Sequence, residues 1–181
     1  SIIKTKQTNI QQVRVVPKGN HIVVEVLYKV DDIELKGDNG RYCSIDLGIN
    51  NLATIGSNVL KPVIINGKPL KSINQYFNKK SSHLQSKSIK TTNRIWKLTQ
   101  KRNNKVDDYL HKSSREIVNH LVSNNINTLI VGYNKGWKQD INIGKVNNQK
   151  FVQIPHAKFI SMLRYKCNLK GITVIENEES Y

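Results

Sequence analysis

The sequence has few cysteines, few acidic residues and no long apolar run. Only Cys43 and Cys167 occur, and neither belongs to a CxxC or Cys/His cluster. The sequence therefore shows no zinc site, and we expect buried, reduced thiols of the kind found in cytosolic proteins. No apolar run reaches the roughly 18 residues that a membrane span needs, and the first ten residues lack the apolar core of a secretory signal. We expect a cytoplasmic protein, nucleoid-associated if it is bacterial, with no membrane partner.

Acidic residues are scarce, because 13 Asp and Glu stand against 29 Lys and Arg, a formal net charge of +16. The stretch from Lys61 to Arg115 alone holds 14 Lys and Arg and only two acids, a net +12. Such a balance favours a polyanion, nucleic acid above all, as partner. Four of the basic residues follow a helical spacing beside Trp96, and a solvated helix face is the alternative to a phosphate-binding one. The candidate nucleic-acid-binding residues are Lys87, Lys90, Arg94, Lys97, Lys101, Arg102 and Lys105.

Apolar periodicity and turn residues predict a mixed α/β chain. Ile10–Val30 predicts a β-hairpin that turns at Pro17–Asn20, and Asp31–Gly40 reads as a polar linker. Arg41–Gly67 predicts three strands joined by short turns, an antiparallel meander. Further on, the pattern predicts three helices, at 70–84, from Thr91 or Thr92 onward, and at 110–122. A buried strand follows at 126–131. A fourth helix is predicted from Ile154 onward, with Pro near its start, and a last strand at 172–175.

One carboxylate, Asp46, lies in the middle of the strand-prone segment Arg41–Asn58. An acid in an otherwise buried strand is costly unless it is paired or holds a cation. Gly48 follows two residues later, where a missing side chain lets a ligand or another backbone approach. An Asp that caps a turn at the strand end is the alternative interpretation.

The string IDLGINNLAT around Asp46 resembles the first catalytic motif of the RuvC nuclease domain in the transposon-encoded TnpB (OrfB) family. A second segment, Phe151–Tyr181, also resembles the family. It begins with FVQIPH, continues with a predicted helix, a Gly and a predicted strand, and ends with ESY, as the corresponding segment of the family does. The resemblance implies an RNase H-like (RuvC) α/β fold, with a mixed sheet, a three-strand meander and a helical insertion, preceded by a β-hairpin from a small barrel. It assigns residues 1–40 to the end of that wedge-like barrel and residues 41–181 to an incomplete nuclease domain with a basic helical region at 68–125.

The same resemblance implies an RNA-guided, divalent-metal-dependent DNA endonuclease of an insertion sequence, with guide RNA and target DNA as partners. In this family Mg²⁺ or Mn²⁺ ions held by carboxylates cut the phosphodiester by a two-metal mechanism. Asp46 matches the first of these acids. The second acid of the family is commonly a Glu at the position where this chain has Gly132. In an alternative arrangement of the family the catalytic Glu lies on the later strand, which implies Glu179 as the second acid and Glu178 as the next candidate. Asp46 and Glu179 are then the expected metal ligands, and a solvated acidic strand end is the alternative for the glutamates.

The third acid of the family, an Asp, follows a zinc ribbon that has no counterpart before Tyr181. We therefore expect a piece of a longer polypeptide, with Zn²⁺ only in the missing part. Such a piece is expected to bind Mg²⁺ weakly and to cleave poorly by itself. The alternative functions are a nuclease-deficient RNA-guided DNA-binding protein and a DNA-strand transferase (transposase), because one fold hosts several chemistries.

Overall fold

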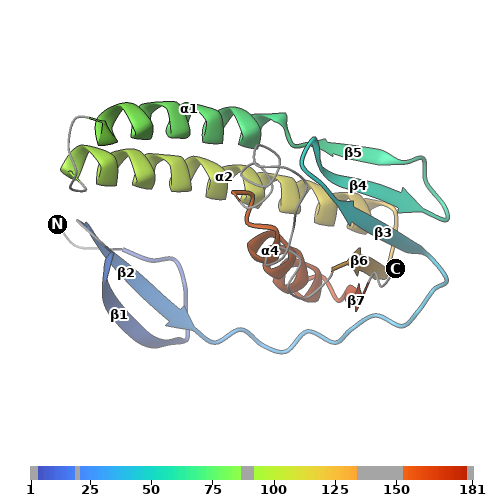
Figure 1. The fold of residues 1–181 in the computed structure, drawn as a ribbon. Coiled ribbons are helices and arrows are strands. Elements are labelled where there is room, and N and C mark those ends of the chain that lie inside the picture. Colours follow the sequence, from blue (N-terminus) through green and yellow to red (C-terminus); the bar gives the residue numbers. More distant parts are fainter. Residues whose placement is uncertain (1–3, 19–20, 87–91, 134–152, 179–181) are drawn as a thin grey trace.

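The computed structural model describes residues 4–18, 21–86, 92–133 and 153–178 (Figure 1). Within them the strands form a two-stranded sheet, β1-β2, and a five-stranded sheet in the order β5-β4-β3-β6-β7. The larger sheet is mixed, because β3 pairs with β4 antiparallel and with β6 parallel. The RNase H-like α/β fold predicted from the sequence is confirmed.

The β-hairpin is formed by β1 (Ile10–Lys18) and β2 (His21–Tyr28), which pair antiparallel. Arg14 and Glu25 face each other across the hairpin and form an ion pair of 2.9 Å. The predicted turn began too early, because Pro17 still pairs with Ile22 inside the hairpin. A two-stranded sheet has only edge strands, so a residue without an N–H is tolerated there.

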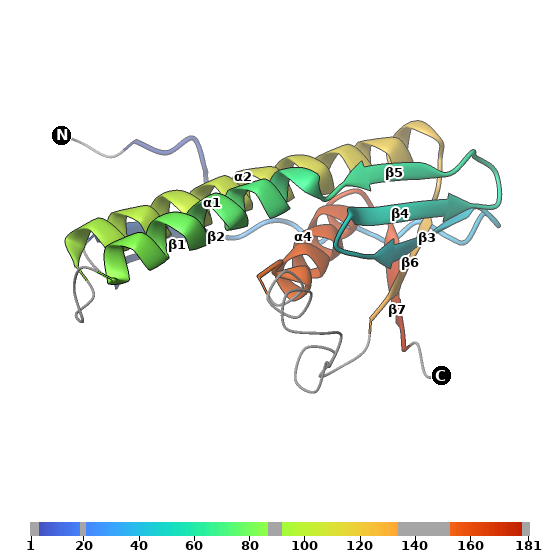
Figure 2. The same ribbon diagram turned by 45° about the horizontal axis from the view of Figure 1, so that its top comes forward.

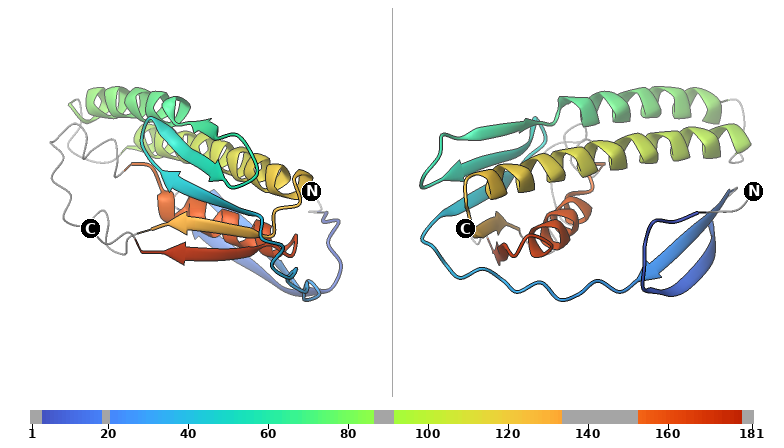
Figure 3. Two further views of the ribbon diagram at one scale, coloured as in Figure 1. Left: turned by 90° about the vertical axis from the view of Figure 1, so that its right-hand side faces the viewer. Right: turned by 180° about the vertical axis from the view of Figure 1, so that it is seen from behind.

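The meander consists of β3 (Tyr42–Leu47), β4 (Asn51–Ser57) and β5 (Val63–Asn66), as predicted. Two parallel strands continue the sheet on the other side of β3, namely β6 (Thr128–Gly132) and β7 (Thr173–Asn177). Since β3 joins the antiparallel half to the parallel half, it is the central strand of the sheet (Figure 3).

Three helices are described: α1 (Lys68–Gln85), α2 (Asn93–Ser123) and α4 (His156–Asn168). The sequence predicted two helices where α2 runs unbroken for 31 residues. The prediction of a break was wrong because this stretch contains neither Gly nor Pro, the two residues that most oppose a helix interior. The predicted start was right, since the Thr92 side chain accepts a hydrogen bond from the Ile95 N–H and caps the helix.

The core lies on one face of the five-stranded sheet. Alternate residues of β3 are buried there, and they pack with apolar residues of α4 and the second half of α2; the core includes Cys43, Ile45, Leu47, Leu110, Ile117, Phe159 and Leu163. Both cysteines are buried and unbonded, as predicted, and burial raises the pKa of Cys167 to about 12. The first half of α2 and most of α1 extend beyond the sheet toward the β-hairpin (Figures 1 and 2).

Part of the predicted polar linker, residues 34–39, passes the starts of β6 and β7 as a strap without regular secondary structure. The Lys36 N–H donates to the Gly171 carbonyl, at 2.8 Å. The side-chain amides of Asn127 and Asn39 donate to the carbonyls of Gly37 and Asn125, each at 2.8 Å. The strap is therefore fixed to the loops that precede β6 and β7. None of the helices in the described ranges has the length and apolar character that crossing a bilayer requires.

Candidate functional site

Asp46 lies on the open face of the sheet, opposite the core. Burial alternates strictly along β3, with Cys43, Ile45 and Leu47 buried and Asp46 among the exposed residues between them. The expectation that the strand around Asp46 is otherwise buried was wrong for the face of Asp46, because a strand turns successive side chains to opposite faces and only one face of β3 is buried. The Asp46 carboxylate has no hydrogen bond or ion pair with any described residue, so it is free to bind a ligand from solvent.

The neighbours of Asp46 across the sheet are small or polar. Asp46 pairs with Thr54 on β4. On the other side the last β3–β6 pair is Ile45 with Val131, so Gly132 is the next residue of β6 beside Asp46. Gly132 in turn pairs with Asn177 of β7. Gly132, the position where the resemblance implies the family's common second acid, is thus next to Asp46 and brings no side chain to the open face.

The C-terminal glutamates are not equivalent. Glu176 pairs with Val131, whose side chain is in the core, and it forms an ion pair with Arg164 of α4 on the helix-covered side. Glu176 therefore points away from Asp46. Glu178 follows β7 directly and is exposed, and Glu179 lies outside the described residues. Among the residues that the structure describes, no three His, Cys, Asp or Glu side chains gather as a metal site.

The turn after Asp46 is held from two sides. His156, 1% exposed at the start of α4, places its Nε2 3.2 Å from the Gly48 carbonyl oxygen. At the other side, the Gly67 N–H donates to the Asn50 carbonyl at 2.8 Å, and Lys71 Nζ donates to the Asn50 side chain at 2.7 Å. We call this turn, residues 48–50 with its partners, the clamped turn. It fixes the backbone two residues after Asp46.

Glycine is required within the clamped turn. A Cβ on Gly48 would lie 2.9 Å from the Asn51 carbonyl oxygen, so the close backbone approach predicted at this residue is confirmed. A Cβ on Gly67 would lie 2.3 Å from the Ile49 carbonyl oxygen. The contact of His156 with Gly48 was not predicted from the sequence. A histidine directly after Pro at the start of a helix, in the segment IPH that was matched to the family, was the available signal.

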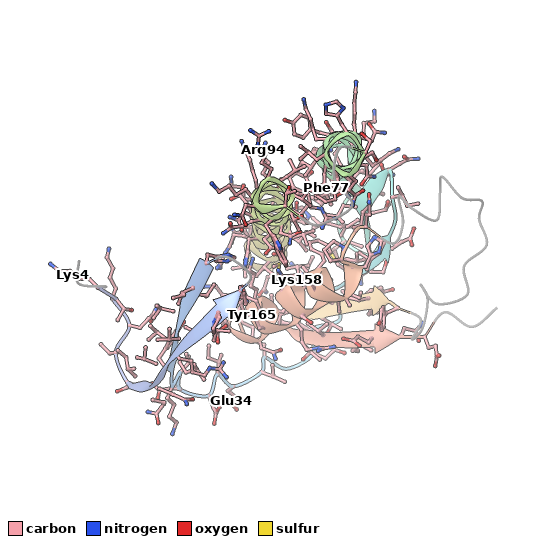
Figure 4. All side chains as sticks on the ribbon, turned by 60° about the vertical axis from the view of Figure 1, so that its left-hand side comes forward. Lys4, Glu34, Phe77, Arg94, Lys158 and Tyr165 are labelled. Carbon is pink, nitrogen blue, oxygen red and sulfur yellow. The ribbon has the colours of Figure 1, made fainter. Side chains whose placement is uncertain are left out.

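The basic residues of α2 divide into two groups. Lys97, Lys101 and Lys105 are exposed, and Arg94 points outward at the start of α2 (Figure 4). A hollow of about 500 Å³ between α1 and α2 is lined by several of them together with Tyr76, Lys80 and His83 of α1. Lys87 and Lys90 lie outside the described residues. The exposed group follows α2 at intervals of three or four residues and lies beside Lys80 of α1, and such a cationic surface suits a phosphate backbone.

Arg102 differs from the other candidates because its guanidinium is bound within the protein. Its Nε donates to Asn74 on α1 and its Nη2 to the Gln153 carbonyl, both at 2.8 Å. The same guanidinium lies over the Phe77 ring, 5.9 Å from its centre. Burial lowers the pKa of Arg102 from its usual value, although a guanidinium stays charged in proteins. Arg102 joins α1, α2 and the segment before α4, and this was not foreseen.

Comparison with known proteins decides the family. The sequence model of the OrfB_IS605 family, described as "Probable transposase", matches residues 25–138, which is more than half of the chain. The chain belongs to the OrfB_IS605 family. The predicted resemblance to the TnpB (OrfB) family is thereby confirmed. No curated protein matches the chain.

The fold of this OrfB_IS605 chain is similar to that of chains in two solved structures. A chain in the cryo-EM structure of a CRISPR-Cas12f ternary complex is 16% identical with a TM-score of 0.63, over 93% of this chain and 35% of that one. A chain in the cryo-EM structure of a Cas12f1–sgRNA–target DNA complex is 14% identical with a TM-score of 0.57, over 87% and 39%. The OrfB_IS605 chain thus spans little more than a third of these proteins. Its family match includes β3, α1 and α2, and therefore both Asp46 and the exposed basic surface.

Proposed function

We propose that this chain is the RuvC-like part of an RNA-guided, divalent-metal-dependent DNA endonuclease of the TnpB type. The observation that carries the proposal is the position of Asp46. It is an unpaired carboxylate on the open face of the central strand, in a chain of the OrfB_IS605 family. The fold likeness to a Cas12f1 chain, whose structure contains an sgRNA and target DNA, supports the choice of partners.

In this proposal Asp46 and Glu179 hold Mg²⁺ or Mn²⁺, with Glu178 as the other candidate. Hard oxygen ligands suit both ions, and Mg²⁺ keeps several waters, so few protein carboxylates suffice. Glu179 follows two positions after Asn177, the last residue of β7, and its role as a ligand rests on the resemblance to the family. When bound, such ions activate a water and stabilise the leaving oxygen of a phosphodiester. Asp46 is the ligand on the sheet itself, and the clamped turn keeps its backbone in place.

The exposed basic surface of α1 and α2 has a separate role in the proposal. Arg94, Lys97, Lys101 and Lys105 contact phosphates of the guide RNA or of the target DNA, without reading bases. Phosphate contacts position a nucleic acid, whereas sequence is read by base pairing with the guide. Binding by this surface should therefore weaken steeply as salt is raised.

The metal site is tested by titrating the chain with Mn²⁺ and following water proton relaxation. We expect weak binding that is lost in Asp46→Asn. The matched control is Asp32→Asn, which removes an exposed carboxylate of the linker outside the sheet and should leave Mn²⁺ binding unchanged. Equal Mn²⁺ binding by Asp46→Asn and the unsubstituted chain would remove Asp46 from the site and refute the proposal.

The reaction is tested with the chain alone and complemented by the C-terminal part of a TnpB-family protein, which by resemblance carries the third acid. With a guide RNA, a matching DNA duplex and Mg²⁺, we expect cleavage only after complementation, and its loss in Asp46→Asn and Glu179→Ala. Gly132 favours one alternative, a nuclease-deficient protein, which would bind the DNA in a guide-dependent way without cutting it. The family description favours another, a transposase, which would yield joined strands.

A further inference from the structure

A cavity of about 570 Å³ opens between the β-hairpin, the first half of α2 and the start of α4. None of its lining residues belongs to the five-stranded sheet, so it is distinct from the surface that carries Asp46. Cavities that bind small ligands have volumes of roughly 300–1,000 Å³. This one is therefore large enough for a single flat ring system with part of its backbone, and it has not been used in the proposed function.

The α2 wall of the cavity combines one aromatic ring with three side-chain amides. Trp96 is 46% exposed, which is unusual for so large an apolar side chain. Gln100, Asn103 and Asn104 line the cavity one to two helical turns later, on the same face of α2. An amide offers both a donor and an acceptor, as the edge of a nucleobase does. A ring face beside such groups is the chemistry by which unpaired bases are recognised.

The charges at the cavity suit a ligand that carries phosphate. Asp107, its one acidic lining residue, is paired with Lys158 of α4 at 2.6 Å, and Figure 4 shows Lys158 directed toward α2. Lys18, at the end of β1, has no ion pair with any described residue and lines the opposite wall. His21, also in the lining, has a buried Nδ1 without a hydrogen-bond partner among the described residues. A positive side chain and a free hydrogen-bonding group thus stand opposite Trp96.

We propose that this cavity binds one unpaired nucleobase of an RNA or DNA strand. Trp96 stacks on the base, the amides of Gln100, Asn103 and Asn104 bond to its edge, and Lys18 contacts the adjoining phosphate. The base must be unpaired, because stacked and paired bases do not offer their faces to side chains. The proposal rests on the nucleic-acid binding proposed above, but it uses neither Asp46 nor a metal ion.

The proposal is tested with a pair of short oligonucleotides of equal charge, one with bases and one abasic, in the presence of a chelator. Stacking on an aromatic side chain contributes about 1–3 kcal/mol per base, so the chain should prefer the base-bearing strand by roughly 5- to 150-fold. We expect Trp96→Ala to lose this preference and Trp96→Phe to retain part of it. The matched control is Tyr165→Ala, which removes an aromatic side chain 44% exposed on α4 outside both the cavity and the basic surface and should leave the preference unchanged.

A second measurement does not depend on the Trp96→Ala variant folding. In a Trp137→Phe background Trp96 is the one tryptophan left, and its fluorescence should be quenched by the base-bearing strand and not by the abasic one. Parallel titrations with RNA and DNA show which strand supplies the base. Asn104→Leu, at an exposed lining residue, should weaken the quenching titration.

Two results would overturn this assignment: a base preference that survives in Trp96→Ala, or Trp96 fluorescence that does not respond to bases. The base preference should persist in Asp46→Asn, since the cavity lies outside the sheet. Failure of the metal site and failure of the base site are therefore distinguishable, because each has its own variant and its own titration.

Discussion

At the scale of the residue, Asp46 is positioned by contacts that do not touch its side chain. Its carboxylate is open to solvent, and what fixes it is the backbone of the clamped turn. His156 is the buried member of that arrangement, with its Nε2 on the Gly48 carbonyl. In the proposed function Asp46 is a metal ligand, and a metal ligand is useful only if its position varies little, so immobilising the backbone behind it would support that role.

We predict that His156→Ala lowers the free energy of unfolding by about 2–3 kcal/mol, since it removes a buried hydrogen-bonding ring and leaves space behind. It should also weaken Mn²⁺ binding at Asp46, although it leaves the carboxylate in place. His156→Gln, which can keep a nitrogen near the Gly48 oxygen, should recover part of both. Urea unfolding and Mn²⁺ titration measure the two effects.

The control for His156 is His83→Ala, at an exposed residue near the end of α1. It should change neither quantity. If His156→Ala is destabilised but binds Mn²⁺ as the unsubstituted chain does, the clamped turn supports the fold and not the site.

At the scale of the element, α2 shows why residues that look alike in sequence act differently. Lys101 and Arg102 are neighbours in one basic stretch, but consecutive residues of a helix point about 100° apart. Lys101 is exposed beside the hollow between α1 and α2, whereas Arg102 bonds to Asn74 and Gln153. One is available for a phosphate, and the other holds three elements together.

This difference gives a paired prediction. Arg102→Met should lower the free energy of unfolding by about 2 kcal/mol, because it leaves buried acceptors without a charged donor. Lys101→Met should leave stability nearly unchanged but reduce the slope of log K against log salt for nucleic-acid binding by about 1. Denaturant unfolding and binding at several salt concentrations separate the two. If Arg102→Met changed the salt slope more than Lys101→Met does, Arg102 would be a phosphate ligand and the prediction would be wrong.

The elements themselves were largely predictable, because their signals are local. Alternation gave β3 and β4, and Thr92 marked the start of α2. What the sequence did not show depends on packing between distant segments: the contact of Arg102 with Gln153, the turn of Glu176 toward Arg164, and the contact of His156 with Gly48. Asp46 was identified as a candidate by the family motif, but the face on which it lies followed only from the alternating burial of β3.

At the scale of the whole molecule, the strap is the segment that connects the β-hairpin to β3, and its hydrogen bonds hold it against the loops before β6 and β7. Gly171, with φ of 67°, lies close against the strap, because a Cβ there would be 2.9 Å from the Glu34 carbonyl oxygen and 3.2 Å from Lys36 Cγ. The strap therefore needs glycine at this position for two reasons: the left-handed backbone and the space. Gly40, at the end of the same segment, has φ of 71° and nothing within 4 Å of its Cβ position.

Comparing alanine substitutions at these two glycines separates the cost of a left-handed backbone from the cost of losing space for the strap. Gly40→Ala should cost about 1 kcal/mol of unfolding free energy, because it places an alanine in the left-handed region. Gly171→Ala carries the same strain and must also displace the strap, so we expect it to cost about 1–2 kcal/mol more. Displacement should expose the backbone after Lys36, and trypsin should cleave there faster in Gly171→Ala than in Gly40→Ala. Equal unfolding energies and equal cleavage rates in the two variants would mean that the strap is not held at Gly171, and that the hairpin is linked to the sheet by other contacts.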